Sequence, residues 1–82
     1  MVAKHKKQMD LSELVASKGT TWAAVVHATG MSPAGIWRVR KGLTEPQEMT
    51  EIRLANALAV ERSVLRAAIA ESRRRAAAGM YE

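Results

Sequence analysis

The hydrophobic positions of this chain recur at helical spacing in five short segments. Leu11, Leu14 and Val15 lie three and four residues apart and predict a first helix that stops at Gly19. The same criterion predicts helices over residues 22–29, 33–41 and 47–59, and a last one from about residue 61 that frays within 73–78. No segment alternates with period two over a useful length, so we expect no strands. The pattern predicts an all-α fold, a compact domain of five helices.

Residues that start helices precede several of these segments. Ser32-Pro33 is the clearest start, with serine as the N-cap and proline at the first helical position, where no N–H is needed. Other side chains that can cap a helix precede the first, second and fourth segments: Asp10 or Ser12, Thr20 or Thr21, and Thr44 or Thr50.

A very short connection, Gly30-Met31-Ser32, separates the second and third predicted helices. Glycine tolerates the positive φ that a tight turn between two steeply crossing helices requires. Apolar residues on both sides can fill the wedge between these helices: Val25, Val26, Met31, Ile36 and Val39. The spacing predicts a helix-turn-helix, in which the outer side of the helix 33–41 is left to enter a major groove.

Length and composition narrow the function classes. The 82 residues fit one domain, and the absence of cysteine excludes disulfides and thiolate-ligated metal. We expect no metal, no cofactor and no small-molecule ligand. The longest apolar stretch, residues 54–60, is broken by Asn56 and is too short to span a bilayer. No apolar run follows the first lysines, so we expect no secretory signal and a cytoplasmic location.

The positive charge is concentrated in one half of the chain. The formal net charge is +5, and residues 1–41 carry seven Lys and Arg against two acidic residues, whereas residues 42–82 carry six Arg against six Glu. This asymmetry is typical of a protein that binds nucleic acid, because basic side chains replace the counterions of the phosphates.

A longer match extends on both sides of the predicted turn. The chain reads TTWAAVVHATGMSPAGIWRVRKGLTEPQEMTEIRLANALAV there, and this text resembles the Cro and repressor type (XRE-like) helix-turn-helix proteins of phages and bacteria. The shared features are a capped helix, an apolar pair, a Thr-Gly-apolar-Ser turn, a glycine after the third helix, a proline-containing loop and the spacing of Ile52, Ala55 and Leu58. With the first and last helices, the resemblance covers about residues 10–70 and implies a lambda-repressor-like fold.

The chain departs from the family at three positions. Val26 stands where alanine is usual, and Trp22 and Trp37 stand where polar residues that contact phosphates or bases are common. These departures bear on individual base contacts rather than on the fold.

The resemblance implies that the helix 33–41 reads double-stranded DNA. Arg38 is the candidate for a bidentate contact with guanine, and the alternative is a phosphate contact or a solvated charge. We expect Arg40 and Lys41 on phosphates and Trp37 partly buried. The whole predicted DNA-binding set is Thr21, Trp22, Ser32, Pro33, Ala34, Trp37, Arg38, Arg40 and Lys41, with Lys4, Lys6 and Lys7 of a basic arm that can enter the minor groove.

Domain boundaries and self-association follow from the same pattern. We expect residues 1–9 to form a flexible arm, 10–78 the DNA-binding domain and 79–82 a C-terminal tail, with residues 73–75 a solvated helix end. A homodimer would place two reading helices on a pseudo-palindromic site. Its predicted surface lies on the last helix, with Ile69 further from the core than Leu65; the alternative is that this stripe only closes the core. The predicted interface residues are Val64, Ala68 and Ile69.

The function that these observations predict is an operator-binding transcriptional regulator, a repressor of the Cro type. We expect it in the cytoplasm, associated with the nucleoid, and in the cytoplasm of the host if a phage encodes it. One alternative is a recombination-directionality or antitoxin-type accessory DNA-binding protein. An alternative of another class is a protein-interaction module that inhibits a polymerase or a repressor. No nucleophile has an obvious base, so we predict no catalytic residues and no enzyme.

Overall fold

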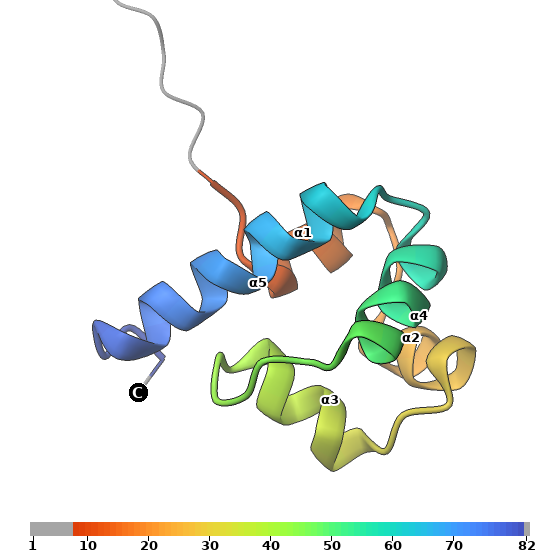
Figure 1. Ribbon diagram of the computed structural model, residues 1–82, viewed down its shortest axis with the longest axis horizontal. Helices are drawn as coiled ribbons and strands as arrows, with labels where there is room; N and C mark the ends of the chain where they lie inside the picture. The colour runs from red at the N-terminus through yellow and green to blue at the C-terminus, as the bar shows by residue number, and fades with distance from the viewer. Residues whose placement is uncertain (1–7, 82) are drawn as a thin grey trace, which may run out of the picture.

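Five helices follow one another in the computed structural model, which describes residues 8–81 (Figure 1). They are α1 (Leu11–Ser17), α2 (Trp22–Thr29), α3 (Pro33–Arg40), α4 (Glu48–Leu58) and α5 (Arg62–Ala77). Over the described range no residue is in a strand, so the all-α prediction is confirmed. The predicted arm residues Lys4, Lys6 and Lys7 lie outside the described residues.

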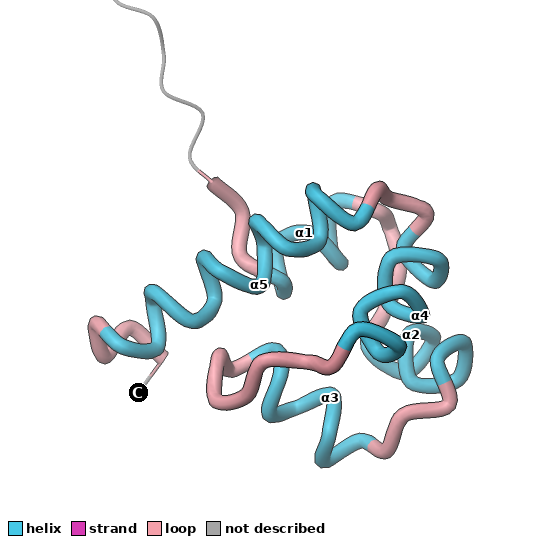
Figure 2. Tube along the Cα trace, viewed as in Figure 1, coloured by secondary structure: helices cyan, strands magenta, loops and turns pink. Residues whose placement is uncertain are grey.

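The helices enclose one apolar core. α5 packs on α1, α3 and α4, while α2 packs on α3 and α4 (Figures 1 and 2). Val25, Ile36 and Val39 are buried, and Val26 and Met31 pack against the core, as the sequence predicts for the wedge between α2 and α3. The other buried hydrophobic residues are Leu11, Leu14, Val15, Leu54, Ala55, Leu58, Leu65, Ala68 and Ile69.

The helix starts follow the sequence, and the predicted caps fail only at α4. Asp10 caps α1 in a capping box, since its carboxylate accepts from the backbone N–H of Glu13 and the Glu13 carboxylate accepts from the Asp10 N–H. Thr21, rather than Thr20, caps α2. The predicted caps Thr44 and Thr50 of α4 are wrong: α4 begins after Gln47, whose side chain makes no cap hydrogen bond.

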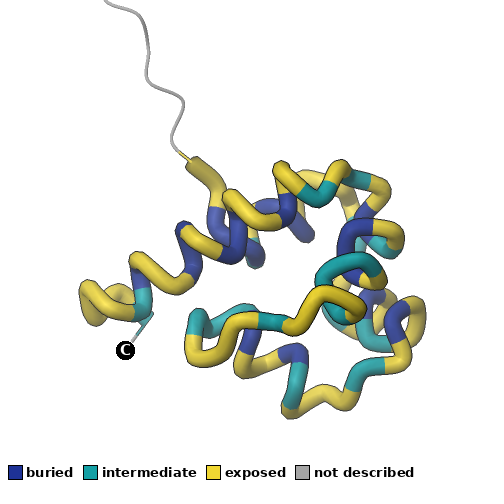
Figure 3. The backbone as a smooth tube through the Cα atoms, viewed as in Figure 1, coloured by how far each residue is buried: buried dark blue, intermediate teal, exposed yellow. Residues whose placement is uncertain are grey.

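The apolar face of α5 is used within the chain (Figure 3). Val64 is 44% exposed, but Ala68 and Ile69 are only 1% and 5% exposed. The prediction that Ile69 lies outside the core is therefore wrong, because α1 and α4 cover this stretch of α5. Ala68 and Ile69 cannot take part in a dimer surface while the fold is intact, and only Val64 of the three predicted residues is accessible.

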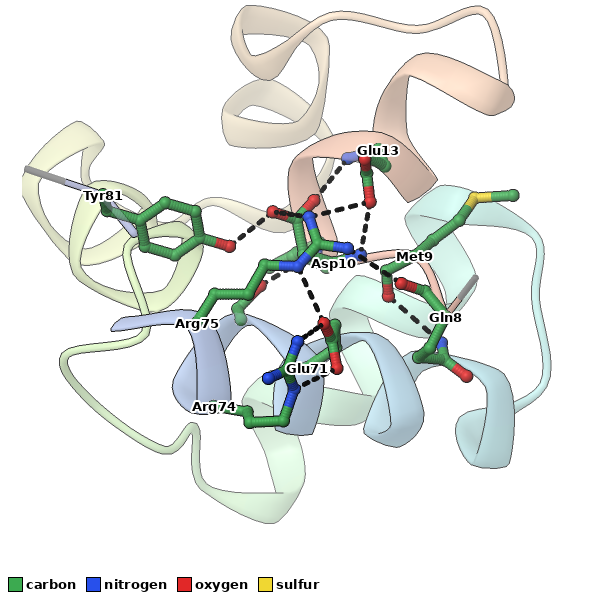
Figure 4. Close-up of polar contacts among 10 residues, drawn as sticks. Gln8, Met9, Asp10, Glu13, Glu71, Arg74, Arg75 and Tyr81 are labelled. Carbon is green, nitrogen blue, oxygen red and sulfur yellow. Dashed lines mark hydrogen bonds and ion pairs between the residues drawn. The ribbon is translucent and has the colours of Figure 1, made fainter. Parts of the chain in front are cut away.

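The C-terminal part of α5 is not the solvated end that the sequence predicts. The helix stays regular to Ala77, and Arg75 is only 6% exposed. Its guanidinium lies 3.1 Å from Asp10, 3.0 Å from Glu13 and 2.7 Å from Glu71 (Figure 4). A cation at this position neutralises carboxylates from two helices. The prediction that residues 73–75 form a solvated helix end is therefore wrong for Arg75.

Residues from both ends of the described chain meet at this cluster. The Arg75 guanidinium also donates to the carbonyl of Gln8, and the Tyr81 hydroxyl donates to Asp10 (Figure 4). Hydrogen bonds from Arg74 and Arg75 lower the pKa of Glu71 to about 2. Burial, together with the hydrogen bond to Asp10, raises the pKa of Tyr81. Tyr81 thus packs back onto the domain, although the sequence predicts a separate tail over 79–82.

The connection between α3 and α4 is held against α5 by a close backbone approach. Gly42 has a φ of +72°, and a Cβ placed on it would lie 2.8 Å from the carbonyl carbon of Ser72 and 2.9 Å from the Cα of Arg73. Both the backbone conformation and the lack of space require glycine. Ser72 is buried, and its hydroxyl accepts from the backbone N–H of Leu11 at 2.9 Å. The C-terminal end of α3 is therefore anchored next to the point where α1 meets α5.

None of the helices that the structure describes is both long enough and apolar enough to cross a membrane.

Candidate nucleic-acid interface

A tight connection sets the position of α3 relative to α2. Gly30 ends α2 in the left-handed conformation, with a φ of +71°. The Thr29 hydroxyl donates to the Val25 carbonyl at 2.8 Å and accepts from the Met31 N–H at 3.3 Å. Ser32 then caps α3. The connection spans three residues, and the backbone N–H groups of Gly30 and Met31 both have hydrogen-bond acceptors. α3 therefore starts in one defined direction.

The outer side of α3 presents two neighbouring stripes of residues. Ile36 and Val39 are buried, so the residues on the opposite side of the helix face outward. Residues four and three apart lie on one face of a helix. One stripe is mainly apolar and consists of Pro33, Trp37 and Arg40, and the other is small and basic and consists of Ala34, Arg38 and Lys41.

Trp22, at the start of α2, joins the apolar stripe of α3. The two helices border a groove of about 400 Å³, lined mainly by Trp22, Val26, Pro33 and Trp37. The guanidinium of Arg40 lies over the Trp22 ring, 4.9 Å from its centroid. Arg40 therefore packs on an aromatic ring, where the sequence alone predicts a phosphate contact.

Trp37 and Lys41 border the C-terminal segment as well. Trp37 is 49% exposed, which fits the predicted partial burial, and it lines a second hollow with Leu43 and Tyr81. The ammonium of Lys41 lies 5.6 Å from the centroid of the Tyr81 ring. The end of α3 and the end of the described chain thus share one surface, which the sequence does not predict.

Two predicted contact residues use their hydroxyl oxygens as helix caps. Thr21 accepts from the Ala24 N–H at 3.1 Å, and Ser32 accepts from the Gly35 N–H at 3.0 Å. A hydroxyl that accepts one hydrogen bond can still donate its own proton. Both residues are exposed, so capping and donation to an outside acceptor are compatible.

Charge separates this surface from the rest of the molecule. No Asp or Glu occurs between Leu14 and Thr44, and this stretch contains Lys18, Arg38, Arg40 and Lys41. Within the described range, none of these four cations forms an ion pair. By contrast, all five arginines of α5 are paired with carboxylates: Arg62, Arg66, Arg73, Arg74 and Arg75.

The structure brings most of the described DNA-binding candidates onto α3 or beside it. Trp22 meets α3 across the groove. Val64, the accessible residue of the predicted dimer surface, belongs to α5 and lines neither hollow. Two residues of this surface were not predicted from the sequence. Val26 was predicted only in the wedge between the helices, and Leu43 was given no role. For Val26 the signal was its larger side chain at a position where the resemblance implies alanine.

Among residues 8–81, no three His, Asp or Glu side chains are grouped so that they could hold a metal ion. No family model matches the chain, and no curated protein and no solved structure matches it either. The α2–α3 surface is therefore the feature of the molecule that bears on its function.

Proposed function

We propose that this chain is a sequence-specific double-stranded DNA-binding transcriptional regulator. In this proposal α2 and α3 form a helix-turn-helix, and α3 is the reading helix that enters the major groove. The observation that carries the proposal is the α2–α3 surface, on which the exposed Arg38 and the partly buried Arg40 and Lys41 stand without any acid in the sequence from 14 to 44. Such a surface attracts a polyanion, and an exposed helix of this size fits the width of a major groove.

Arg38 is the residue that we expect to read a base. It is exposed on the small and basic stripe, and Ala34, the preceding residue of that stripe, is too small to keep a base edge away. Its guanidinium can donate two parallel hydrogen bonds to guanine O6 and N7. Lys41, one turn further along, is suited to the phosphate backbone, because its ammonium is a point charge on a flexible stem.

The test starts with selection of bound duplexes from random DNA. Arg38→Ala is expected to weaken binding to the selected duplex by about 1–3 kcal/mol and to relax the preference at one base pair. Arg53→Ala is the matched control, because Arg53 is also an exposed helical arginine without an ion pair in the described structure, but on α4. Both variants lose one charge, so general electrostatic attraction falls equally and any additional loss in Arg38→Ala is local.

Two results would contradict the proposal. If no sequence is enriched and binding to random duplexes does not weaken with salt, the chain is not a DNA-binding protein, and an interaction module becomes the better interpretation. If Arg38→Ala and Arg53→Ala bind the selected duplex equally well, α3 does not read bases through Arg38.

A homodimer on two half-sites remains part of the proposal. One reading helix covers few base pairs, and two of them about 34 Å apart read successive major grooves. Val64 is exposed and apolar on α5, so Val64→Glu is expected to weaken cooperative binding to a selected palindrome without unfolding the chain. Sedimentation with and without the duplex measures this. A parent protein that binds the full site as a monomer would rule out the dimer.

A further inference from the structure

The apolar groove between α2 and α3 has a chemistry that phosphate contacts and Arg38 do not explain. It has a volume of about 400 Å³, and Arg40 is the one charged side chain among those that line it. Trp22 and Trp37, on its two sides, are the two tryptophans of the chain. Large aromatic rings at the surface provide much apolar contact area at little cost in conformational entropy.

The charge around the groove limits what can occupy it. The groove lies wholly within the stretch from 14 to 44, which has four cations and no acid. Arg40 lies over Trp22, and Arg38 and Lys41 stand on the adjacent stripe of α3. The occupant must therefore belong to a polyanion and yet offer an apolar group at the point where it meets the two indole rings.

Duplex DNA offers such a group in the major groove. The thymine C5-methyl is the apolar feature among the donors and acceptors of the base-pair edges. 5-Methylcytosine carries the same methyl on the same ring carbon, and it projects into the same groove. A methyl group against Trp22, Pro33 and Trp37 loses its contact with water and itself carries no polar atom that would need a partner.

We propose that this groove binds the C5-methyl group of a pyrimidine in the major groove of DNA. The chain then distinguishes base pairs by a methyl contact at the α2–α3 groove in addition to the hydrogen bonds of Arg38. This inference rests on the proposed function, since it requires α3 to face the major groove. It assigns Trp22 and Trp37 a direct part in specificity, at the positions where the family resemblance implies polar side chains.

The experiment uses the full chain and the duplex recovered by selection. Each thymine is replaced in turn by deoxyuridine, and each cytosine in turn by 5-methylcytosine, so that one methyl is removed or added without a change in charge. Removal of a methyl that enters the groove is expected to weaken binding about fourfold, and addition of one at that place to strengthen it by a similar factor. The emission of the two tryptophans reports directly on the groove.

A pair of variants separates the groove from the rest of the surface. Trp37 is half exposed, so Trp37→Ala is expected to keep the helical circular dichroism and the salt dependence of binding while it abolishes the difference between the methylated and unmethylated duplexes. Arg38→Ala weakens binding to every duplex but keeps their ratio. If the methyl effect remains in Trp37→Ala, the groove is not where the methyl binds.

The remaining outcomes are distinct. An effect of deoxyuridine alone identifies thymine as the source of the methyl, and an effect of 5-methylcytosine alone identifies methylated cytosine. If no substitution changes affinity although a duplex was selected and Arg38→Ala weakens it, the methyl inference is wrong and the proposed function stands. If no duplex is bound at low salt, both are wrong.

Discussion

Arg38 and Arg75 are the same type of residue on helices of one small domain, but their surroundings differ completely. Arg38 is exposed on α3, within a stretch of sequence that has no acid. Arg75 is buried on α5 and lies within 3.1 Å of each of three carboxylates, those of Asp10, Glu13 and Glu71. One arginine is available to an outside anion, and the other is committed to the fold.

The comparison shows that the number of arginines does not locate a binding surface. α5 carries more arginines than α3, yet each of them faces a carboxylate. Ion pairing also shifts the pKa of the paired groups. Hydrogen bonds to Glu71 and the charges of Asp10 and Glu13 raise the pKa of Arg75. The cations that remain for a partner, among the described residues, are concentrated on α3.

The largest expected effect comes from removing the buried cation. Arg75→Met leaves Glu71 with Arg74 but deprives the buried Asp10 of its cation, and a buried charge without its partner is strongly destabilising. We expect the melting temperature of this variant to fall further than that of any other single arginine variant, as followed by circular dichroism.

Two controls sharpen this prediction. Arg66→Met removes an exposed ion pair with Glu51 and is expected to have little effect, because solvent screens such pairs. Arg38→Met is expected to leave the melting temperature unchanged and to weaken DNA binding. Equal melting temperatures for Arg75→Met and Arg66→Met would show that the buried cluster does not stabilise the fold.

A smaller loss of stability is expected at Gly42, where the connection between α3 and α4 approaches α5. Gly42→Ala forces a side chain into the left-handed region and against the backbone of Ser72 and Arg73, so we expect a cost of about 2 kcal/mol or more in the free energy of unfolding. Urea denaturation measures it. The matched control is Gly19→Ala, which has the same positive φ but open space around the added Cβ, and which should cost clearly less. Equal costs would mean that the close approach to α5 carries no penalty.

Acid should destabilise the ion-paired cluster around Arg75 over a pH range set by the pKa of Glu71. Its pKa is lowered from 4.5 to about 2 in the folded state, so the stability it contributes is fully present above pH 4.5 and is lost as the pH falls toward 2. Glu71→Gln lacks this contribution. We expect the difference in stability between parent and Glu71→Gln to be constant near neutral pH and to shrink between pH 4.5 and 2. A difference that stays constant across this range would contradict the assignment.

The smallest expected effect concerns the salt dependence of DNA binding. Lys41→Gln removes one cation from the acid-free surface, and loss of one phosphate contact lowers the slope of log affinity against log salt by about 0.9. Arg66→Gln removes a cation that is already paired with Glu51 at 2.8 Å, so the slope should stay the same. An equal change in both variants would mean that net charge, rather than the α3 surface, controls binding.

Much of the helical architecture could be predicted because it is encoded locally. The apolar spacing marks all five helices, and Gly30 with Ser32 and Pro33 marks the α2–α3 connection within a residue of where it lies. The start of α4 was also predicted within a residue, but its cap was not. No capping side chain defines it, and the threonines nearby do not serve as caps.

The sequence by itself determined which segments are helical and which half of the chain holds the unbalanced charge, because both depend on neighbours along the chain. Only the tertiary structure decided which side chains are available. Ile69 and Arg75 look like surface residues in the sequence, and they are buried because α1 and α4 cover α5 and because Asp10, sixty-five positions away, supplies a countercharge. The groove of Trp22 and Trp37 likewise exists only because the Gly30 turn sets α2 beside α3. Which helix covers a face and which carboxylate balances a cation depend on residues far apart in sequence, and helical periodicity alone does not identify these partners.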